Sequence, residues 1–405
     1  MNDTLSRLER ELAHADPERI LSDLVSIPSH PEAPGAEGPL AEFIARFFRA
    51  QGIEVEISEA APGRPNLTAR VRGTGGGRTL LLCGHLDTVP PYGMQDPFSP
   101  RVRDGYLYGR GSTDMKAGLA AMMAALASVH RAGISLAGDF AFGGVADEEL
   151  GSLGAGALAR SGFKADGAII GEPTELRVCL GHRGLEWLAA EFLGKTVHGG
   201  DQDRGINAIV HAARFIGRIE SELAPALKLR RHPLLGSSTV NIGKIEGGTQ
   251  PSTVAGECRV LIDRRYLPSE RYEEVLSEFR VMLEESAKGT PGLRTFLKVM
   301  DASVMAGGLV HAPSLLAENH PLALACREAF PGPDGKPAPF TAFPAWTDAG
   351  VLSEYAKIPT VICGPGKLES AHSDGECVEL AQVRACALAY ARTALLFCGT
   401  TRRPG

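Results

Sequence analysis

Three residues in one short stretch have side chains that could bind a divalent metal ion. His85 and Asp87 follow directly after the apolar residues 80–83, and Asp114 precedes a segment with helical periodicity. The apolar run is typical of a buried strand in a parallel sheet, which would deliver His85 at the strand's carboxyl end, where α/β proteins bind ligands. Asp87 could accept the second ring proton of His85 and fix its tautomer. Taken alone, Asp114 could equally be a helix N-cap, and a single histidine after a strand is more often structural.

Acidic residues follow two further apolar runs. Residues 139–145 predict a strand that leads into Asp147, Glu148 and Glu149, and residues 167–171 predict another that ends before Glu172. Because neighbouring carboxylates point in different directions, one can bind a metal while the other exchanges protons. We assign Glu149 to the metal and Glu148 to proton transfer. For these three acids alone, a solvated acidic turn is the simpler interpretation.

A second histidine completes the set of candidate ligands. Residues 359–363 predict one more buried strand, and residues 364–366 lead from it toward His372. The charges of two divalent ions would be balanced by three ligand carboxylates and one hydroxide, as a dry cavity requires. Oxygen and nitrogen ligands without a thiolate favour zinc, with cobalt or manganese as alternatives.

The composition indicates a globular protein with two domains. The chain has 405 residues, a length that exceeds the usual size of a single-core domain, and 44% of its residues are hydrophobic. Its formal charge of -6, its pI near 6.0 and the absence of basic runs argue against a nucleic-acid partner. The first residues lack the apolar core of a signal peptide and no stretch reaches membrane-spanning length, so we expect a cytoplasmic protein without membrane contact. The eight cysteines are scattered and are expected to be buried thiols.

Helical and strand-like patterns alternate around the residues already named. A helical stripe at residues 40–47 precedes an alternating strand at 53–57, and a second helical stripe runs through residues 119–129. The glycine-rich residues 73–77 are interpreted as a hairpin-type loop, because no helix start follows them as it would in a dinucleotide fingerprint. The pattern predicts an α/β fold with a mostly parallel sheet.

Four motifs, in their order along the chain, resemble the M20 family of metallopeptidases and deacylases. This family includes acetylornithine deacetylases, succinyl-diaminopimelate desuccinylases, aminoacylases and glutamate carboxypeptidases. The resemblance covers nearly the whole chain, and its motifs are residues 84–90 (GHLDTVP), 107–116 (LYGRGSTDMK), 147–149 (DEE) and 171–174 (GEPT).

The resemblance implies a role for each candidate residue. Asp114 would bridge two metal ions, Glu148 would be the general base, and Asp87 would orient His85. The remaining ligands would be divided between the ions, with His85 and Glu172 on one and Glu149 and His372 on the other.

The family's second domain, a lid inserted between catalytic segments, would here span residues 183–299. The catalytic domain would then consist of residues 1–182 and 300–405. Helical stripes at 206–219 and 272–283 alternate with strand-like runs at 185–193, 239–245 and 255–262. This order fits two helices on a small antiparallel sheet, so the lid would be an α+β domain.

The resemblance also implies residues that contact the substrate. His198 matches a histidine that polarises the substrate carbonyl, Arg265 matches an arginine that binds a substrate carboxylate, and Thr347 lies where the family has a substrate-facing threonine. The chain departs from the deacylase pattern at Ser252 and Ala255, where Asn and Pro are usual, and has glycine at both residues 199 and 200. These departures concern the substrate side and leave the metal centre unchanged.

The implied reaction is metal-assisted hydrolysis of an amide, in which Glu148 takes a proton from the attacking water and returns it to the leaving amine. The leading substrate is an N-acylated amino acid whose carboxylate Arg265 would bind, and the alternative is a dipeptidase or carboxypeptidase. In such deacylases the lids pair across a two-fold axis, which implies a homodimer in which His198 enters the partner's active site. A metal-binding scaffold without activity is the hypothesis from another class, but every expected catalytic position is filled.

Overall fold

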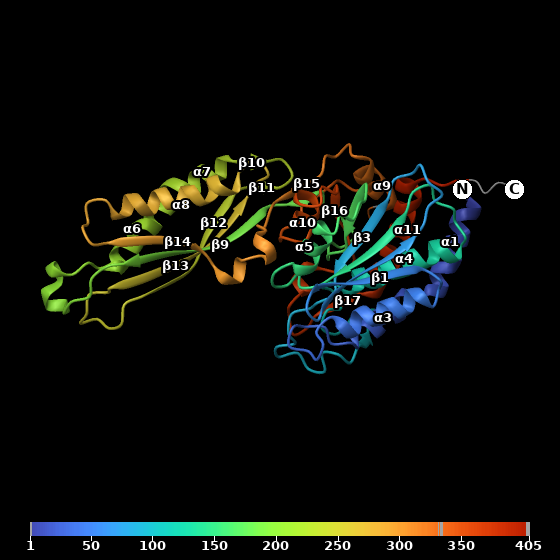
Figure 1. Cartoon of the computed structure of the whole chain (residues 1–405), viewed down its shortest axis with the longest axis horizontal. Coiled ribbons are helices and arrows are strands. Elements are labelled where there is room, and N and C mark those ends of the chain that lie inside the picture. The colour runs from blue at the N-terminus through green and yellow to red at the C-terminus, as the bar shows by residue number, and fades with distance from the viewer. Residues whose placement is uncertain (1, 331, 333–334, 402–405) are drawn as a thin grey trace. The chain divides into compact units, whose positions relative to one another are not determined.

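The computed structural model describes residues 2–330, 332 and 335–401, and the chain divides into two compact units (Figure 1). Unit 1 comprises Met1–His182 and Ser314–Gly405, and unit 2 comprises Arg183–Pro313. The predicted inserted domain begins at the same residue and ends at 299. In the structure the next residues remain with unit 2, because the main-chain N–H of Met300 donates to the Trp187 carbonyl and the Tyr266 hydroxyl donates to the His311 carbonyl.

Unit 1 is built on a six-stranded sheet in the order β1-β2-β6-β3-β7-β16. Strands β6, β3, β7 and β16 are parallel, whereas β2 runs antiparallel to both of its neighbours. The predicted α/β class with a mostly parallel sheet is confirmed. The strands span Glu54–Ala61 (β1), Arg64–Val71 (β2), Leu80–His85 (β3), Phe140–Val145 (β6), Gly167–Ile170 (β7) and Thr360–Ile362 (β16).

Helices cover both faces of this sheet, which explains why its central strands are continuously apolar. Leu81 and Cys83 of β3 share a buried cluster with Leu158 and Leu352 from the helices on one face. Because side chains alternate along a strand, the other two leucines of β3 face the opposite side, where Phe48 packs on a phenylalanine of β6. The first face carries α5 (Leu153–Arg160) and α10 (Ala349–Glu354), and the second carries α3 (Gly38–Arg49), α4 (Lys116–Arg131) and α11 (Leu380–Cys398).

Three further helices pack outside this second layer. The first two helices of the chain lie against α4, and a later helix lies against α11. Helix α4 is therefore buried along nearly its whole length, which suits its Ala- and Met-rich sequence. The three helices are α1 (Asn2–Ala15), α2 (Pro17–Val25) and α9 (Pro321–Ala329).

The prediction of a hairpin-type loop at residues 73–77 is wrong. Strands β2 and β3, which this loop connects, do not pair with each other, because β6 lies between them and pairs with both. The loop instead runs against residues 137–138. A Cβ atom on Gly73 would lie 2.4 Å from the carbonyl carbon of Gly138, and one on Gly77 would lie 2.3 Å from the Gly138 nitrogen. Glycine is required here for close backbone approach.

Unit 2 is a four-stranded antiparallel sheet with two helices packed on one face, as the sequence predicts. The strand order is β12-β13-β9-β14, and the core between sheet and helices includes Phe192, Phe215 and Phe279. The prediction omits β14, an edge strand that pairs only with β9. The elements are β9 (Gly184–Leu193), α6 (Ala208–Arg218), β12 (Thr239–Gly247), β13 (Glu257–Tyr266), α8 (Tyr272–Ala287) and β14 (Arg294–Val299).

Short elements complete both units. In unit 1, a three-stranded sheet contains the strand that follows His372, and a two-stranded pair joins the ends of the two segments. In unit 2, the helix α7 (Ala224–Leu229) precedes a two-stranded pair. The strands concerned are β4 (Arg101–Arg103), β5 (Tyr106–Tyr108) and β17 (Cys377–Glu379), then β8 (Gly181–His182) with β15 (Ser314–Leu315), and β10 (Arg231–His232) with β11 (Gly236–Ser237).

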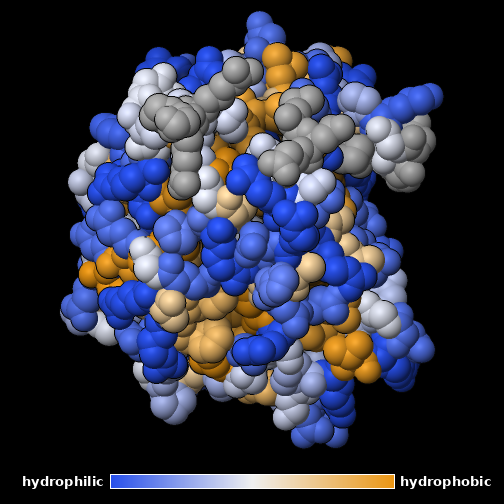
Figure 2. Space-filling model, turned by 90° about the vertical axis from the view of Figure 1, so that its right-hand side faces the viewer, coloured by the Kyte–Doolittle hydropathy of each residue, from blue (hydrophilic) through white to orange (hydrophobic). Residues whose placement is uncertain are grey.

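The surface is mostly hydrophilic, and most of the cysteines are buried. Hydrophilic residues cover most of the face shown in Figure 2, and hydrophobic residues are scattered among them, as is normal for protein surfaces. Among the described residues, no helix is long and apolar enough to cross a membrane. All eight cysteines are free and seven are buried, which confirms the expectation of buried thiols.

Candidate metal centre

The candidate ligands lie at one edge of the unit 1 sheet. His85 is the last residue of β3, Glu149 follows β6 and Glu172 follows β7. These strands are adjacent and parallel, so their carboxyl ends meet at the same edge. His372 follows β16 and the short helix η5 (Leu368–Ser370), and Asp114 lies immediately before α4. The fold therefore gathers five residues that are far apart in the sequence.

Asp114 lies between the two histidines, with one carboxylate oxygen toward each. Its Oδ1 is 3.0 Å from His85 Nε2, and its Oδ2 is 3.3 Å from His372 Nε2. Each histidine also has an acid of its own: His85 Nε2 lies 3.7 Å from Glu172 Oε1, and His372 Nε2 lies 3.1 Å from Glu149 Oε2. The contacts form two groups that share the Asp114 carboxylate, and the assignment of these groups to two metal ions remains a prediction.

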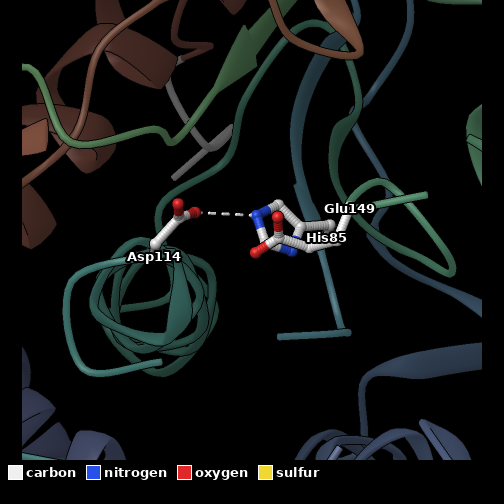
Figure 3. A group of neighbouring side chains, drawn as sticks. All are labelled: His85, Asp114 and Glu149. Atoms are coloured by element: carbon white, nitrogen blue, oxygen red, sulfur yellow. Dashed lines mark hydrogen bonds and ion pairs between the residues drawn. The ribbon is translucent and has the colours of Figure 1, made fainter. Parts of the chain in front are cut away.

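The centre is compact. Possible ligand atoms of His85, Asp114 and Glu149 all lie within 4.8 Å of one another, and the three side chains converge in Figure 3. Met115, not Asp114, occupies the N-cap position of α4, so the N-cap alternative for Asp114 is excluded. His85 is 2% exposed, whereas the His372 side chain is 48% exposed, which leaves the centre open on the His372 side.

Charges in the centre are unbalanced. Burial raises the pKa of Glu172 and of Glu149, and the nearby Asp114 carboxylate raises both further. Hydrogen bonds with Asp114 and Glu149 raise the pKa of His372 to about 10. Without cations, protons must therefore supply the missing positive charge. Divalent cations would supply it instead, and a donor set of imidazole nitrogens and carboxylate oxygens is suited to them. The residues fit two divalent ions.

Asp87 contacts both His85 and the loop after β6. His85 Nδ1 lies 2.9 Å from the main-chain carbonyl oxygen of Asp87, while the nearest carboxylate oxygen is 3.6 Å away. The main-chain carbonyl is the nearer partner of this ring nitrogen and the carboxylate lies within ion-pair distance of it, so the role of Asp87 in orienting His85 remains a prediction. The Asp87 carboxylate accepts the main-chain N–H groups of Glu148 at 3.1 Å and Glu149 at 3.0 Å. Asp87 thus fixes the loop that carries the two glutamates.

Glu148 lies beside the centre. In the part of the chain that the structure describes, its side chain forms no hydrogen bond with His85 or His372. Burial raises its pKa well above the usual range, although His85 opposes this, and the carboxylates of Glu172, Asp348 and Glu149 raise it further. A carboxyl group with a raised pKa is suited to accept and return a proton near neutral pH. The geometry is compatible with the predicted division of roles between Glu148 and Glu149.

The other predicted residues are in less central positions. Thr347 is buried in unit 1, and its Oγ1 accepts the main-chain N–H of Ala349 at the start of α10, 3.1 Å away. His198 is exposed in unit 2, where it is the N-cap of the short helix η1 (Gly199–Arg204). Its Nδ1 accepts the main-chain N–H of Gly200 at 3.1 Å. These bonds give both residues a local structural role, and their functional roles remain predictions.

Arg265 lies on β13 in unit 2 and already has a partner. Its Nε and Nη2 donate to the Asp263 carboxylate at 2.7 and 2.9 Å, and the Trp187 indole donates to the same carboxylate at 3.1 Å. A substrate carboxylate would therefore share or displace this pair. The binding role of Arg265 remains a prediction.

Several charged residues behind the centre, most of them buried, are given no role by the sequence prediction. Arg64 Nη2 donates to Asp147 Oδ1 at 2.8 Å and its Nε donates to Glu37 Oε2 at 2.6 Å, which anchors the loop after β6. Burial raises the pKa of Asp348 to about 7 beside the same loop. Asp147 and Asp348 are each adjacent in the sequence to a residue with a predicted role, and this adjacency could have identified them. Nothing in the local pattern identifies Glu37 or Arg64.

Two histidines and several acids around one shared carboxylate, at the edge of a mostly parallel sheet, are a donor set suited to a metal-dependent hydrolase. Comparison with family models then places the chain: the model of peptidase family M20/M25/M40 matches residues 81–396, and the chain belongs to this family. The predicted family is thus confirmed, as is the predicted enzyme class, a hydrolase acting on amide or peptide bonds.

The similarity to two relatives extends over nearly the whole chain. An N-formyl-4-amino-5-aminomethyl-2-methylpyrimidine deformylase from Halalkalibacterium halodurans is 29% identical, with 97% of each chain covered. An acetylornithine deacetylase from Myxococcus xanthus is also 29% identical, covering 98% of this chain and 100% of the relative.

Solved structures share the fold. A tripeptidase from Staphylococcus aureus matches with a TM-score of 0.77 at 24% identity, covering 96% of this chain and 98% of the other. A dinuclear metal-binding M20 peptidase from Bacillus subtilis matches with a TM-score of 0.68 at 17% identity, covering 99% and 100%.

Proposed function

We propose that this protein is a two-metal amidohydrolase that removes the acyl group from an N-acylated amino acid. The observation that carries the proposal is the position of Asp114, with one oxygen toward His85 and the other toward His372. A carboxylate that serves two sets of ligands is what a two-ion centre needs. The relatives support the reaction, because a deacetylase and a deformylase both release a small acyl group from an amine.

Zinc is the proposed metal at both sites, since each site offers one imidazole nitrogen and carboxylate oxygens without a thiolate. Cobalt or manganese would fit the same donors. Bound in pairs, such ions polarise a substrate carbonyl and make water a stronger nucleophile near neutral pH. His85 and Glu172 would hold one ion, Glu149 and His372 the other, and Asp114 both.

The chain's own residues carry the proton. The Glu148 carboxylate accepts a proton from the attacking water as the new C–O bond forms at the amide carbon. When the C–N bond breaks, Glu148 donates that proton to the leaving nitrogen, so the products are a carboxylic acid and an amine. Asp87 holds the main chain of Glu148 throughout by its hydrogen bond to the N–H group.

Arg265 is proposed to bind the free carboxylate of the substrate, and Thr347 to contact the substrate. A second candidate is removal of a formyl group from an amine without a carboxylate, which the similarity to the deformylase favours. Dipeptidase or carboxypeptidase activity on the same centre is the further alternative. All three reactions use the same base and differ in the substrate groups outside the scissile bond.

A panel of substrates tests the proposal. Purified protein loaded with zinc, cobalt or manganese would be assayed with N-acetylornithine, other N-acetyl and N-succinyl amino acids, N-formyl amines and dipeptides. Two ions per chain and highest kcat/KM on N-acyl amino acids are expected. Protein that binds no divalent ion would refute the two-metal centre, and preference for formyl amines or dipeptides would replace the proposed substrate.

We also propose a homodimer in which the exposed His198 stabilises the oxyanion in the partner's active site. One preorganised donor is worth about a hundredfold or more in rate. His198→Ala and Glu148→Ala chains would be inactive alone, but co-refolding should produce mixed dimers with one complete site. If mixed dimers with verified subunit exchange stay inactive, His198 does not act across the dimer.

A further inference from the structure

A buried carboxylate lies directly behind the loop that presents Asp114. Glu376, just before β17, is 1% exposed. Its Oε1 accepts the main-chain N–H groups of Thr113 at 3.0 Å and Asp114 at 3.1 Å. Its Oε2 accepts the N–H of Gly111 at 3.0 Å and the Arg110 Nη1 at 2.6 Å. Three main-chain N–H groups of one loop thus converge on a single side chain.

These hydrogen bonds matter because the loop contains no strand or helix that would pair its main-chain groups. It connects β5, which ends at Tyr108, to α4, which begins at Lys116. Main-chain N–H groups buried in such a loop need acceptors, and Glu376 provides them. The conformation that Glu376 holds is the one in which the oxygens of Asp114 point at His85 and His372.

Arg110 extends the same network to two neighbouring loops. Its guanidinium is fully buried, and Nη1 also donates to the carbonyl of Ser373, 3.3 Å away. Its Nη2 donates to the carbonyl of Pro91 at 3.3 Å. Ser373 follows His372 in the chain, and Pro91 lies in the loop after β3. Arg110 and Glu376 therefore join the loop of Asp114 to the segments that follow His85 and His372.

We infer that Glu376 and Arg110 are positioning residues that set the orientation of Asp114 and thereby the affinity of the centre for its ions. The inference rests on the proposed metal centre and adds residues to it that touch neither metal nor substrate. Outer partners of metal ligands typically change metal affinity by about 10- to 100-fold when they are removed. We expect an effect of this size for Glu376.

The rival explanation is that Glu376 only neutralises the buried charge of Arg110. Two variants separate these roles. Glu376→Gln keeps the size of the side chain but places an NH₂ group against N–H donors of the loop, so acceptors are lost. The double variant Glu376→Gln/Arg110→Met also removes the guanidinium, so no buried charge is left without a partner.

Asp139→Asn provides a matched control. Asp139 also accepts a main-chain N–H, from Gly73 at 2.8 Å, and pairs with Arg70 at 3.1 Å. It precedes β6 and therefore lies at the opposite edge of the sheet from the centre. This variant loses the same kinds of bond without disturbing the Asp114 loop.

Zinc affinity is the measurement, by competition with a chromophoric chelator, together with zinc content and circular dichroism. We expect Glu376→Gln and the double variant to bind zinc about 10- to 100-fold more weakly than the wild type. Asp139→Asn should bind like the wild type. Raising free zinc by the same factor should restore two ions per chain in Glu376→Gln, whereas a misfolded fraction would not recover at any zinc concentration.

The outcomes distinguish this inference from the proposed function. Wild-type affinity in Glu376→Gln, or recovery of wild-type affinity in the double variant, would overturn the positioning role. A wild-type protein that binds no divalent ion, whether zinc, cobalt or manganese, would overturn the proposed metal centre itself. If Glu376→Gln does not fold, Glu376→Asp keeps the charge but withdraws the carboxylate by about 1.5 Å, and it should weaken zinc binding in the same direction. Unchanged affinity in Glu376→Asp would then refute the inference.

Discussion

Replacing Glu148 by Gln separates proton transfer from metal binding. The substitution keeps the shape of the side chain and removes its ability to accept a proton. The main-chain N–H of Glu148 would still donate to Asp87 Oδ1, as it does at 3.1 Å, because this bond does not involve the side chain. Contacts with His85 and His372 come from other acids, so the ligand sets should remain complete.

The size of the effect follows from the role of the group. General acid–base catalysis contributes about 10²- to 10⁴-fold, and Glu148 would act once as base and once as acid. We therefore expect kcat to fall by about 10³-fold or more, which corresponds to about 4 kcal/mol of activation free energy. KM should change by only a few-fold, since the side chain is not proposed to bind the substrate.

The assay combines kcat and KM on an N-acyl amino acid with metal content per chain. Glu149→Gln is the matched control, because the same substitution one residue later removes a carboxylate that lies 3.1 Å from His372 Nε2. It should lose metal, whereas Glu148→Gln should retain two ions per chain. Loss of an ion from Glu148→Gln, or retention of more than about a tenth of wild-type kcat, would contradict the assigned proton-transfer role.

Asp114→Ala should empty both metal sites whereas His372→Ala should chiefly empty one, as metal analysis after dialysis will show; two tightly held ions in Asp114→Ala would place the bridge elsewhere. Arg265→Ala should raise KM for substrates with a free carboxylate much more than for their amides, because only the carboxylates lose a charge-assisted pair. Equal losses would make Arg265 a structural partner of Asp263. Burial, with a contribution from Arg265, lowers the pKa of His311 from 6.5 to about 4, so the folded protein resists its protonation and stability falls as the pH drops below 6.5. Urea unfolding should show that His311→Gln removes about 2 kcal/mol of the wild-type loss between pH 7 and pH 5, and an unchanged pH dependence would contradict this.

The location of the centre could be predicted from the sequence alone. Continuous apolar runs mark strands buried on both faces, and the polar residues that follow them must emerge at the carboxyl edge of the sheet. His85, Glu149 and Glu172 could be predicted in this way, because strand and ligand are neighbours in the chain. The inserted unit was also predictable, since its helical stripes and alternating strands are local patterns.

The contacts that hold the ligands in place depend on the tertiary structure. The pairing of β6 with both β2 and β3 depends on long-range hydrogen bonds, so the loop at residues 73–77 could not be assigned from its glycines. The carboxylate of Asp87 also accepts two main-chain N–H groups of the loop after β6, which its spacing from His85 does not predict. Glu376 accepts hydrogen bonds from a loop 262 to 265 residues away in the chain. No periodic pattern encodes such contacts, because they depend on which loops the folded sheet brings to the same edge.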